Sequence, residues 1–297
     1  MVHKTLLAIG ETMAMVTPET AVRVTRADRF RVDSGGAESN VAAHVAALGH
    51  RAQWFSRLGR DALGDRVIQQ LSVRGIDTSR VIRDAAHRTG LYVKDPGHGV
   101  AYYRDGSAAS HLSPADADRF SLEGVDIVHV SGITAALSTS AADFLERVFG
   151  RAHQAGVPIS FDVNHRRPLW SASAAAPVLA DLARRADIVF TGRDEAQELW
   201  AAATDDDIRA LFSDVPELVV KDGDVGATLY AGDVKVFEPA LTVDVVEVVG
   251  AGDAFAGGYL AARLSGDEPR QRLRAGHSRA AMTLRTTGDF VEEGMLP

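Results

Sequence analysis

Short apolar runs alternate with longer amphipathic stretches along most of the chain. A run that is apolar at every position is typical of a strand buried on both faces, whereas apolar residues spaced three and four apart are typical of a helix. This rhythm predicts βαβ units, and therefore an α/β fold with a mostly parallel central sheet flanked by helices. The predicted strands are 5–9, 52–56, 127–132, 158–163, 188–190 and 218–221, and the predicted helices include 41–48, 139–155, 175–185, 194–202 and 205–212.

Two segments, residues 12–33 and 88–104, follow a different pattern in which apolar and polar residues alternate one by one. Alternation predicts short antiparallel strands with one face exposed to water. We expect these strands to form a small antiparallel β lid, as a sub-domain of a single domain over residues 1–297, because no long linker divides the chain. The short strands expected in the first segment are 13–17, 22–24 and 30–32.

A glycine-rich stretch, Gly250-Ala251-Gly252-Asp253, lies between two apolar segments near the end of the chain. The segment before it, 241–249, predicts a strand, and the segment after it, 254–264, predicts a helix. The backbone N–H groups that open a helix have no partner within it and favour an anion such as phosphate. A carboxylate would repel that anion, so Asp253 is better suited to removing a proton from a group beside it. The stretch therefore indicates phosphoryl transfer to a hydroxyl.

Other interpretations of this stretch are weaker. A dinucleotide fingerprint needs glycine at its first, third and sixth positions, and the sixth position here is Phe255. A P-loop needs Gly-Lys-Ser or Gly-Lys-Thr, and none of the lysines follows a glycine. The remaining alternative is an ordinary helix start with Asp253 as a capping residue.

The amino-acid composition limits the classes of partner that the protein can bind. The chain has 40 acidic and 32 basic residues and a net charge of −8, which argues against nucleic acid or an anionic membrane as partner. It contains no cysteine, so disulfides and thiolate chemistry are excluded. No apolar run reaches the roughly 18 residues that a membrane span needs, and the first residues do not form a signal peptide. We expect a cytoplasmic protein.

Several motifs together resemble the ribokinase-like (PfkB) carbohydrate kinases. Gly250 to Phe255 followed by Gly257-Gly258 is similar to the C-terminal signature of that family, and Gly35-Gly36 with Asn40-Val41-Ala42 is similar to its N-terminal signature. The segment 57–64 also matches, and the motifs occur in the order of the family over nearly the whole chain. The resemblance implies a ribokinase-like fold and a kinase that uses ATP and Mg²⁺.

The resemblance also implies roles for individual residues. Asp253 would be the general base, and Gly250, Ala251 and Gly252 would form the anion hole for the transferred phosphoryl group. Gly35, Gly36 and Asn40 would bind sugar hydroxyls. The residues implied to bind ATP are Asn164, Lys221, Gly223, Gly226, Gly250 and Gly252.

The substrate half resembles the 2-keto-3-deoxygluconate kinases of this family. The matching segments are Tyr102-Tyr103-Arg104 and Asp162 to Arg166. Guanidinium groups bind carboxylates through paired hydrogen bonds, so Arg104 and Arg166 indicate a sugar acid, although each arginine could instead form a surface ion pair. The resemblance adds Tyr102, Tyr103 and Asp289 to the residues expected to contact substrate.

Two departures from the family concern cations. Gly192 occupies the position of an asparagine that helps to organise Mg²⁺ in the family. Glu195, acting through water, is then the expected metal residue, and Asp194 could share this role. Glu247-Val248 replaces the common Asp-Thr pair before the anion hole, so dependence on a monovalent cation stays open.

The leading hypothesis is an ATP-dependent kinase that phosphorylates the terminal hydroxyl of 2-keto-3-deoxygluconate, or of a close sugar acid, to the 6-phosphate. A fructokinase or other hexose kinase of the same family is the nearer alternative, and a non-catalytic sugar-acid sensor is the alternative from another class. The sequence does not distinguish the gluco from the galacto epimer. We further expect a homodimer in which two lids pack together.

Overall fold

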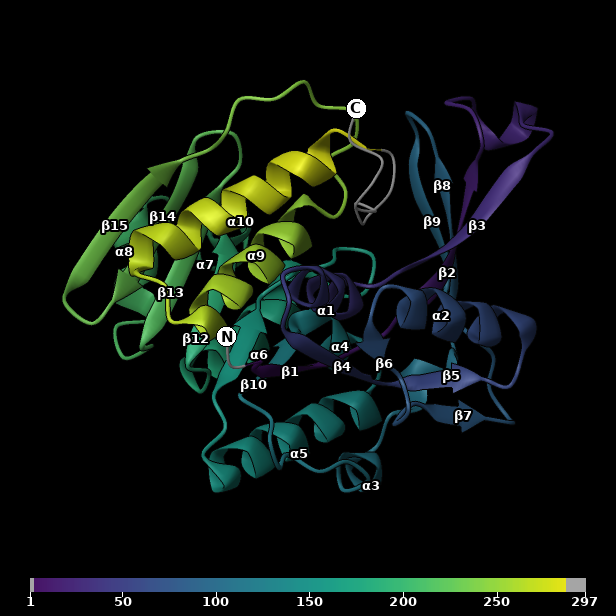
Figure 1. Cartoon of the computed structure of the whole chain (residues 1–297), viewed down its shortest axis with the longest axis horizontal. Helices are drawn as coiled ribbons and strands as arrows, with labels where there is room; N and C mark the ends of the chain where they lie inside the picture. Colours follow the sequence, from purple (N-terminus) through teal and green to yellow (C-terminus); the bar gives the residue numbers. More distant parts are fainter. Residues whose placement is uncertain (1–2, 287–297) are drawn as a thin grey trace.

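The computed structural model describes residues 3–286 and contains a nine-stranded sheet whose central strands are parallel (Figure 1). The sheet confirms the expected α/β fold, and every strand predicted for its parallel part is present. The hairpin β14–β15, which extends one edge in antiparallel orientation, was not predicted. The order across the sheet is β15 (Val234–Pro239), β14 (Gly226–Ala231), β13 (Glu217–Asp222), β12 (Ile188–Gly192), β11 (Ile159–Asp162), β10 (Ile127–Ser131), β1 (Thr5–Ile9), β4 (Arg51–Phe55) and β6 (Ile76–Asp77).

Helices cover both faces of this sheet, because successive side chains of each strand point to opposite faces. In β1, Leu7 and Ile9 pack into one hydrophobic core, while Leu6 and Ala8 pack into the other. One face is covered by α5 (Thr139–Ala155), α6 (Ala172–Arg184), α7 (Arg193–Trp200) and α8 (Asp205–Leu211), and the other by α1 (Ala37–Ala47), α2 (Ala62–Val73), α9 (Ala251–Ser265) and α10 (Pro269–Leu284).

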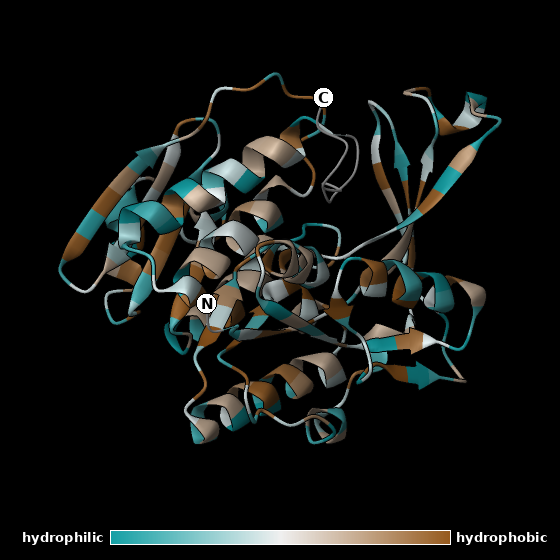
Figure 2. Cartoon of the chain, viewed as in Figure 1, coloured by the Kyte–Doolittle hydropathy of each residue, from teal (hydrophilic) through white to brown (hydrophobic). Residues whose placement is uncertain are grey.

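Helix α5 shows why the sequence determines some bounds so well. The hydroxyl of Ser138 accepts a hydrogen bond from the Ala141 N–H and caps the first turn, and Gly156 ends the helix in the left-handed region with φ of 64°. Hydrophobic and hydrophilic residues both occur along this helix (Figure 2). Its buried residues recur every three or four positions, so one face packs on the sheet.

A second, four-stranded sheet rises from the edge of the main sheet (Figure 1). Its two hairpins are antiparallel, and a parallel pair, β2 with β8, joins them. The short strand expected at 22–24 is wrong. The chain forms a 3₁₀ turn, η1 (Val24–Arg26), there, because the Val24 N–H donates to a side-chain oxygen of Asp95 instead of to a strand. The order is β3 (Phe30–Gly35), β2 (Met13–Pro18), β8 (Leu91–Asp95) and β9 (Gly99–Tyr103).

The strand expected at 241–249 is also wrong. This segment follows β15, lies outside both sheets and has no regular structure. Its apolar residues have another use, because Leu241, Val243 and Val245, together with Thr242, line a cavity. Helix α9 then begins at Ala251, three residues earlier than expected, after Gly250 adopts a left-handed φ of 85° that favours glycine.

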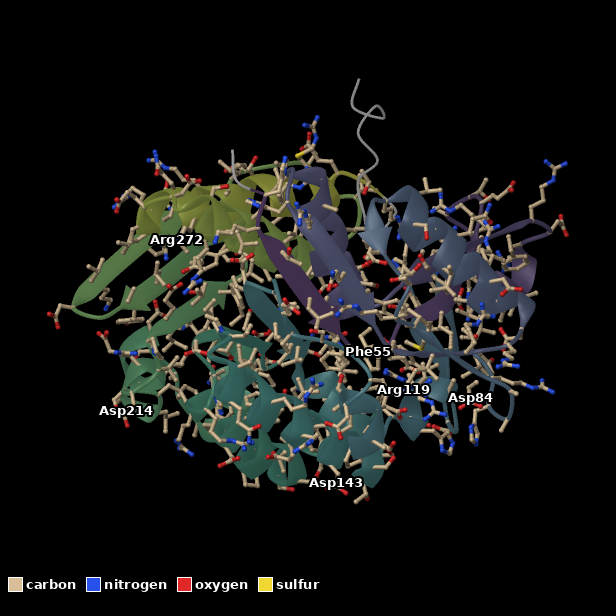
Figure 3. All side chains as sticks on the ribbon, turned by 60° about the horizontal axis from the view of Figure 1, so that its bottom comes forward. Phe55, Asp84, Arg119, Asp143, Asp214 and Arg272 are labelled. Carbon is tan, nitrogen blue, oxygen red and sulfur yellow. The ribbon has the colours of Figure 1, made fainter. Side chains whose placement is uncertain are left out.

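Helix α9 is anchored to the sheet through one carboxylate, Glu217 at the start of β13. Arg263 and the Tyr259 hydroxyl of α9 each donate to it at 2.9 Å, and Arg272 of α10, labelled in Figure 3, donates at 3.2 Å. These bonds fix the C-terminal half of α9 beside the start of β13. The N-terminal turn of α9 is therefore held at the other edge of the sheet, where the parallel strands end.

The opposite face of the sheet is closed by an aromatic cluster around Phe55 (Figure 3), whose ring lies 4.6 Å from that of Phe120 and 6.1 Å from that of Phe144. Beside it, Arg57 forms ion pairs with Asp84 and Asp116. The remaining short elements are β5 (Arg57–Gly59), β7 (Ile82–Asp84), η2 (Ala108–His111), α3 (Pro114–Ala117) and α4 (Gly132–Leu137).

Candidate active site

The carboxyl ends of four parallel strands open into one cavity of about 700 Å³. Glu11 follows β1, Asn164 follows β11, β12 ends at Gly192, and β13 carries Lys221. Strand order reverses between β1 and β10, where an α/β sheet opens a crevice. The structure therefore brings together strand ends that are far apart in the sequence.

Asp253 lines this cavity from the first turn of α9. One of its carboxylate oxygens accepts a hydrogen bond from the Asn40 amide at 2.9 Å, although the two residues are 213 positions apart. Gly35 and Gly36 line the cavity beside Asn40. The structure thus places the expected base, its orienting amide and the expected sugar-binding glycines in one space.

The expected anion hole lies where the cavity meets a second one. Gly252 is exposed and lines both cavities, whereas Gly250 lines the first and Ala251 the second. The Ala251 N–H donates to the Val248 carbonyl at 3.3 Å within a turn. Of the three residues expected to form the anion hole, Gly252 is therefore the one that faces both cavities.

The second cavity, of about 540 Å³, is lined mainly by apolar side chains of α9, α10 and the segment 241–248. Gly223 and Gly226, both expected to bind ATP, line it, and each adopts a positive φ. Lys221, Val248 and Gly252 line both cavities. A ligand spanning the two cavities would pass these three residues.

The lid contributes Tyr102 and Arg104 to the first cavity, and both come from the same face of β9 and the residue that follows it. Tyr103 is not among the lining residues and its side chain is 65% exposed, because adjacent strand residues point to opposite faces. Contact between Tyr103 and the substrate stays a prediction. Arg104 is buried and forms an ion pair with Glu11, whose other oxygen accepts from the Ser107 hydroxyl.

Arg166 lines the same cavity, is exposed, and has no ion pair within residues 3–286. It follows Asn164, which holds a left-handed φ of 42° that asparagine tolerates better than most residues. After this backbone turn, the segment 164–168 lines the cavity. Asp289 lies outside the described residues.

The side chain of Glu195 turns back onto the first turn of its own helix, α7. Its carboxylate accepts hydrogen bonds from the N–H groups of His165 and Gly192 and from the Thr191 hydroxyl. Burial raises the pKa of Glu195 to about 7, and the nearby charge of Asp162 adds to this. A side chain at Gly192 would begin 2.6 Å from an Asp194 oxygen, so Asp194 fills part of the space that an asparagine would need.

The comparison with known families agrees with this geometry. The model of the pfkB family carbohydrate kinases matches residues 3–291. The chain belongs to this family.

Two relatives of this PfkB kinase carry the name 2-dehydro-3-deoxygluconokinase. The protein of Bacillus subtilis is 36% identical over 96% of this chain and 90% of its own length, and that of Thermoproteus tenax is 33% identical over 96% and 89%. A crystal structure of 2-dehydro-3-deoxygluconokinase from Thermotoga maritima has the same fold, with a TM-score of 0.89 and 24% identity over 98% of this chain and 95% of that one. The ribokinase-like fold class is confirmed.

Two acidic residues to which the sequence gave no role, Glu11 and Asp162, line the cavity of this PfkB kinase, and a third, Glu38, is buried behind Gly10. Glu11 pairs with Arg104, Asp162 pairs with Lys221, and Glu38 is fully buried with its carboxylate bonded to the Ser131 hydroxyl. Glu11 and Asp162 both stand at strand ends, which was the available signal. Glu38 gave no signal, because its burial depends on the space left above Gly10.

That space has a consequence for stability. A first side-chain carbon at Gly10 would lie 2.1 Å from the Glu38 carboxyl carbon, and Oε2 of Glu38 has no hydrogen-bond partner within the described residues. Burial raises the pKa of Glu38 from 4.5 to about 7. Between these values the folded chain holds a proton that the unfolded chain has lost, so this group makes stability fall as pH rises from about 4.5 to about 7.

Glu38→Gln, which cannot ionise, should therefore gain stability relative to the wild type as pH rises. We expect the difference in free energy of unfolding to change by on the order of 2 kcal/mol between about pH 5 and about pH 8. Urea unfolding at both pH values measures it, with exposed Glu123→Gln as the control. Parallel pH dependences of wild type and Glu38→Gln would contradict the prediction.

Gly36 is required for a close approach of two backbones. A side chain there would begin 2.4 Å from the Glu11 carbonyl oxygen and 2.8 Å from the Thr12 Cα, and neither is the end of a flexible side chain. Gly36→Ala should lower the free energy of unfolding by about 1–3 kcal/mol and raise the KM for the sugar. Gly150→Ala in α5, where a side chain meets nothing within 4 Å, is the matched control and should gain up to about 1 kcal/mol. Equal effects of the two substitutions on thermal unfolding would refute this explanation.

Proposed function

We propose that this PfkB kinase transfers the γ-phosphoryl group of ATP to the terminal hydroxyl of 2-keto-3-deoxygluconate or a close sugar acid, giving the 6-phosphate. The observation that carries the proposal is that Arg104 and Arg166 line the same cavity as Asp253. A neutral hexose has no group that needs two guanidinium side chains. The names of the two bacterial and archaeal relatives support the same substrate class.

The two arginines have different parts in this proposal. Arg104 is already paired with Glu11, so it offers a carboxylate only the N–H groups that this pair leaves over. Arg166 has no such pair within residues 3–286 and is exposed to the cavity. We therefore assign the substrate carboxylate chiefly to Arg166, with Arg104 and the ring of Tyr102, which lies 5.6 Å from the Arg104 guanidinium, completing the pocket.

In the reaction, Asp253 accepts the proton of the sugar hydroxyl while that oxygen bonds to the γ-phosphorus. The bond from γ-phosphorus to the bridging oxygen breaks, and its electron pair stays on ADP. The Asn40 amide donates to one oxygen of the Asp253 carboxylate and so keeps it oriented toward the hydroxyl. The backbone N–H groups of Gly250 and Gly252 stabilise the charge that develops on the phosphoryl oxygens, and the Ala251 N–H joins them if it leaves the Val248 carbonyl.

We propose that the apolar second cavity holds the nucleotide, with Gly223 and Gly226 against it and Lys221, Asn164, Gly250 and Gly252 near its phosphates. No cluster of three or more histidine, aspartate or glutamate side chains that could enclose a metal occurs within residues 3–286. This fits Mg²⁺, which is commonly held by substrate phosphates and water with few protein ligands, and Glu195 would reach it through water. When bound, Mg²⁺ would neutralise phosphate charge.

Dependence on a monovalent cation is a separate question. It is tested by comparing the rate of phosphorylation in K⁺ with the rate in tetramethylammonium.

We further propose one domain over residues 1–297 and a homodimer through the lid. The lid exposes Val22, Phe30 and Tyr103, which water solvates poorly. A closed lid would exclude water and so prevent hydrolysis of ATP. The proposed homodimer is tested by light scattering, which should give the mass of two chains.

No helix within residues 3–286 is both long and apolar enough to cross a membrane. We propose the cytoplasm, where ATP is available, as the location.

The function is tested by coupling ADP formation to a spectroscopic readout across a panel of acceptors. We expect 2-keto-3-deoxygluconate, or its galacto epimer, to give the highest kcat/KM, and ³¹P NMR to place the phosphate on the terminal oxygen. A preference for fructose would favour the hexose-kinase alternative. Binding of a sugar acid without any turnover would favour the sensor.

A further inference from the structure

Lys221 stands where the two cavities meet. It lines both, and its Nζ lies 3.0 Å from an Asp162 oxygen. The first carbon of a side chain built on Gly252 would lie 3.7 Å from Nζ, so the ammonium faces the first turn of α9. The ammonium therefore lies beside the place where the nucleotide cavity and the sugar cavity share their lining.

The neighbouring strand leaves room for this lysine. In the parallel pairing of β12 with β13, Gly192 is the register partner of Lys221. Gly192 presents no side chain, so Lys221 supplies the polar group at this pair of strand ends. The side chain of Lys221 reaches past this position to Asp162 at the end of β11, the next strand beyond β12, and this ion pair fixes its direction.

The surroundings keep Lys221 charged. Burial by itself would lower the pKa of Lys221, but the charges of Asp162, Glu195 and Asp253 outweigh burial and raise it. A lysine that stays protonated cannot act as a base. It can neutralise negative charge, and its single ion-pair partner among the described residues leaves N–H donors for a second anion.

We propose that Lys221 is a catalytic residue whose ammonium binds the γ-phosphoryl group during its transfer to the sugar hydroxyl. It keeps its proton throughout, and the hydroxyl proton goes to Asp253. The inference rests on the phosphoryl-transfer function of the site and goes beyond a general contact with ATP. The ammonium of Lys221 is the cation that this chain itself brings to the transferred phosphoryl group. It lies beside the end of β12, where Gly192 has no side chain.

Lys221→Met removes the charge and keeps the length of the side chain. We expect kcat to fall about 100-fold or more, as when one charge-stabilising donor is removed from an active site. The affinity for ADP should stay within about threefold of the wild type, because ADP lacks the transferred group. Lys221→Arg should retain part of the activity. Lys235→Met, which removes an exposed lysine paired with Asp206, is the matched control and should leave kcat unchanged.

If the role of Lys221 were purely structural, it would only neutralise the charge of Asp162. The double variant Lys221→Met/Asp162→Asn distinguishes this structural role from the catalytic one. If Lys221 acts on the phosphoryl group, the double variant is about 100-fold slower than Asp162→Asn alone. Equal rates of the double variant and Asp162→Asn, or an equal loss of ADP and ATP affinity in Lys221→Met, would overturn the proposal. Thermal unfolding of each variant shows whether it is folded.

The acceptor in these assays is whichever sugar the wild type phosphorylates fastest. If that sugar is not 2-keto-3-deoxygluconate, the substrate proposal fails and the Lys221 measurement still stands. If the wild type phosphorylates no sugar, the catalytic function itself fails, independently of any variant.

Discussion

Asp253→Asn lowers kcat for sugar phosphorylation by roughly 10²- to 10⁴-fold in our expectation, and leaves the binding of ATP and sugar within a few-fold of the wild type. The amide keeps an oxygen that accepts from Asn40, so the side chain stays in place. It cannot take a proton from the sugar hydroxyl, and the attacking oxygen must then lose its proton to water. Steady-state kinetics combined with calorimetric binding of each substrate measures the two effects separately.

The control for this charge change is Asp233→Asn in the exposed turn between β14 and β15, which should have no effect on kcat. Turnover of Asp253→Asn at nearly the wild-type rate would remove Asp253 from the role of base. It would also leave the Asn40 contact as a purely structural bond.

Arg166→Ala is expected to discriminate between classes of substrate. Hydrogen bonds between charged groups contribute about 1.5–3 kcal/mol, so kcat/KM for a sugar acid should fall by roughly 10- to 100-fold. The value for fructose should change by less than about threefold, because fructose has no carboxylate to lose a partner. Arg166→Lys keeps the charge without the paired geometry and should fall between the two.

Arg147→Ala, which removes an exposed arginine paired with Asp118 on the far side of the sheet, is the matched control for Arg166→Ala. Equal losses on the sugar acid and on fructose would mean that Arg166 supports the pocket without recognising a carboxylate. In that case the argument for a sugar acid would rest on Arg104 alone, which Glu11 already holds.

Local sequence determined much of the secondary structure. The strands of the parallel sheet are buried on both faces, so their apolar runs could be identified without knowing their neighbours. Helix α5 was predicted with its observed bounds, since a serine cap and a terminal glycine act within a few residues. The strand prediction for the segment 241–249 is wrong because its apolar residues line a cavity and the segment belongs to neither sheet.

The sequence by itself also determined the chemistry, because a glycine-rich helix start and a carboxylate are neighbours along the chain. Only the tertiary structure decided how the distant groups are used. Asn40 orients Asp253, Glu11 occupies Arg104, and Lys221 meets Asp162. These pairs form because strand order brings the carboxyl ends of the sheet together. Strand order depends on packing over the whole chain, which no local pattern encodes.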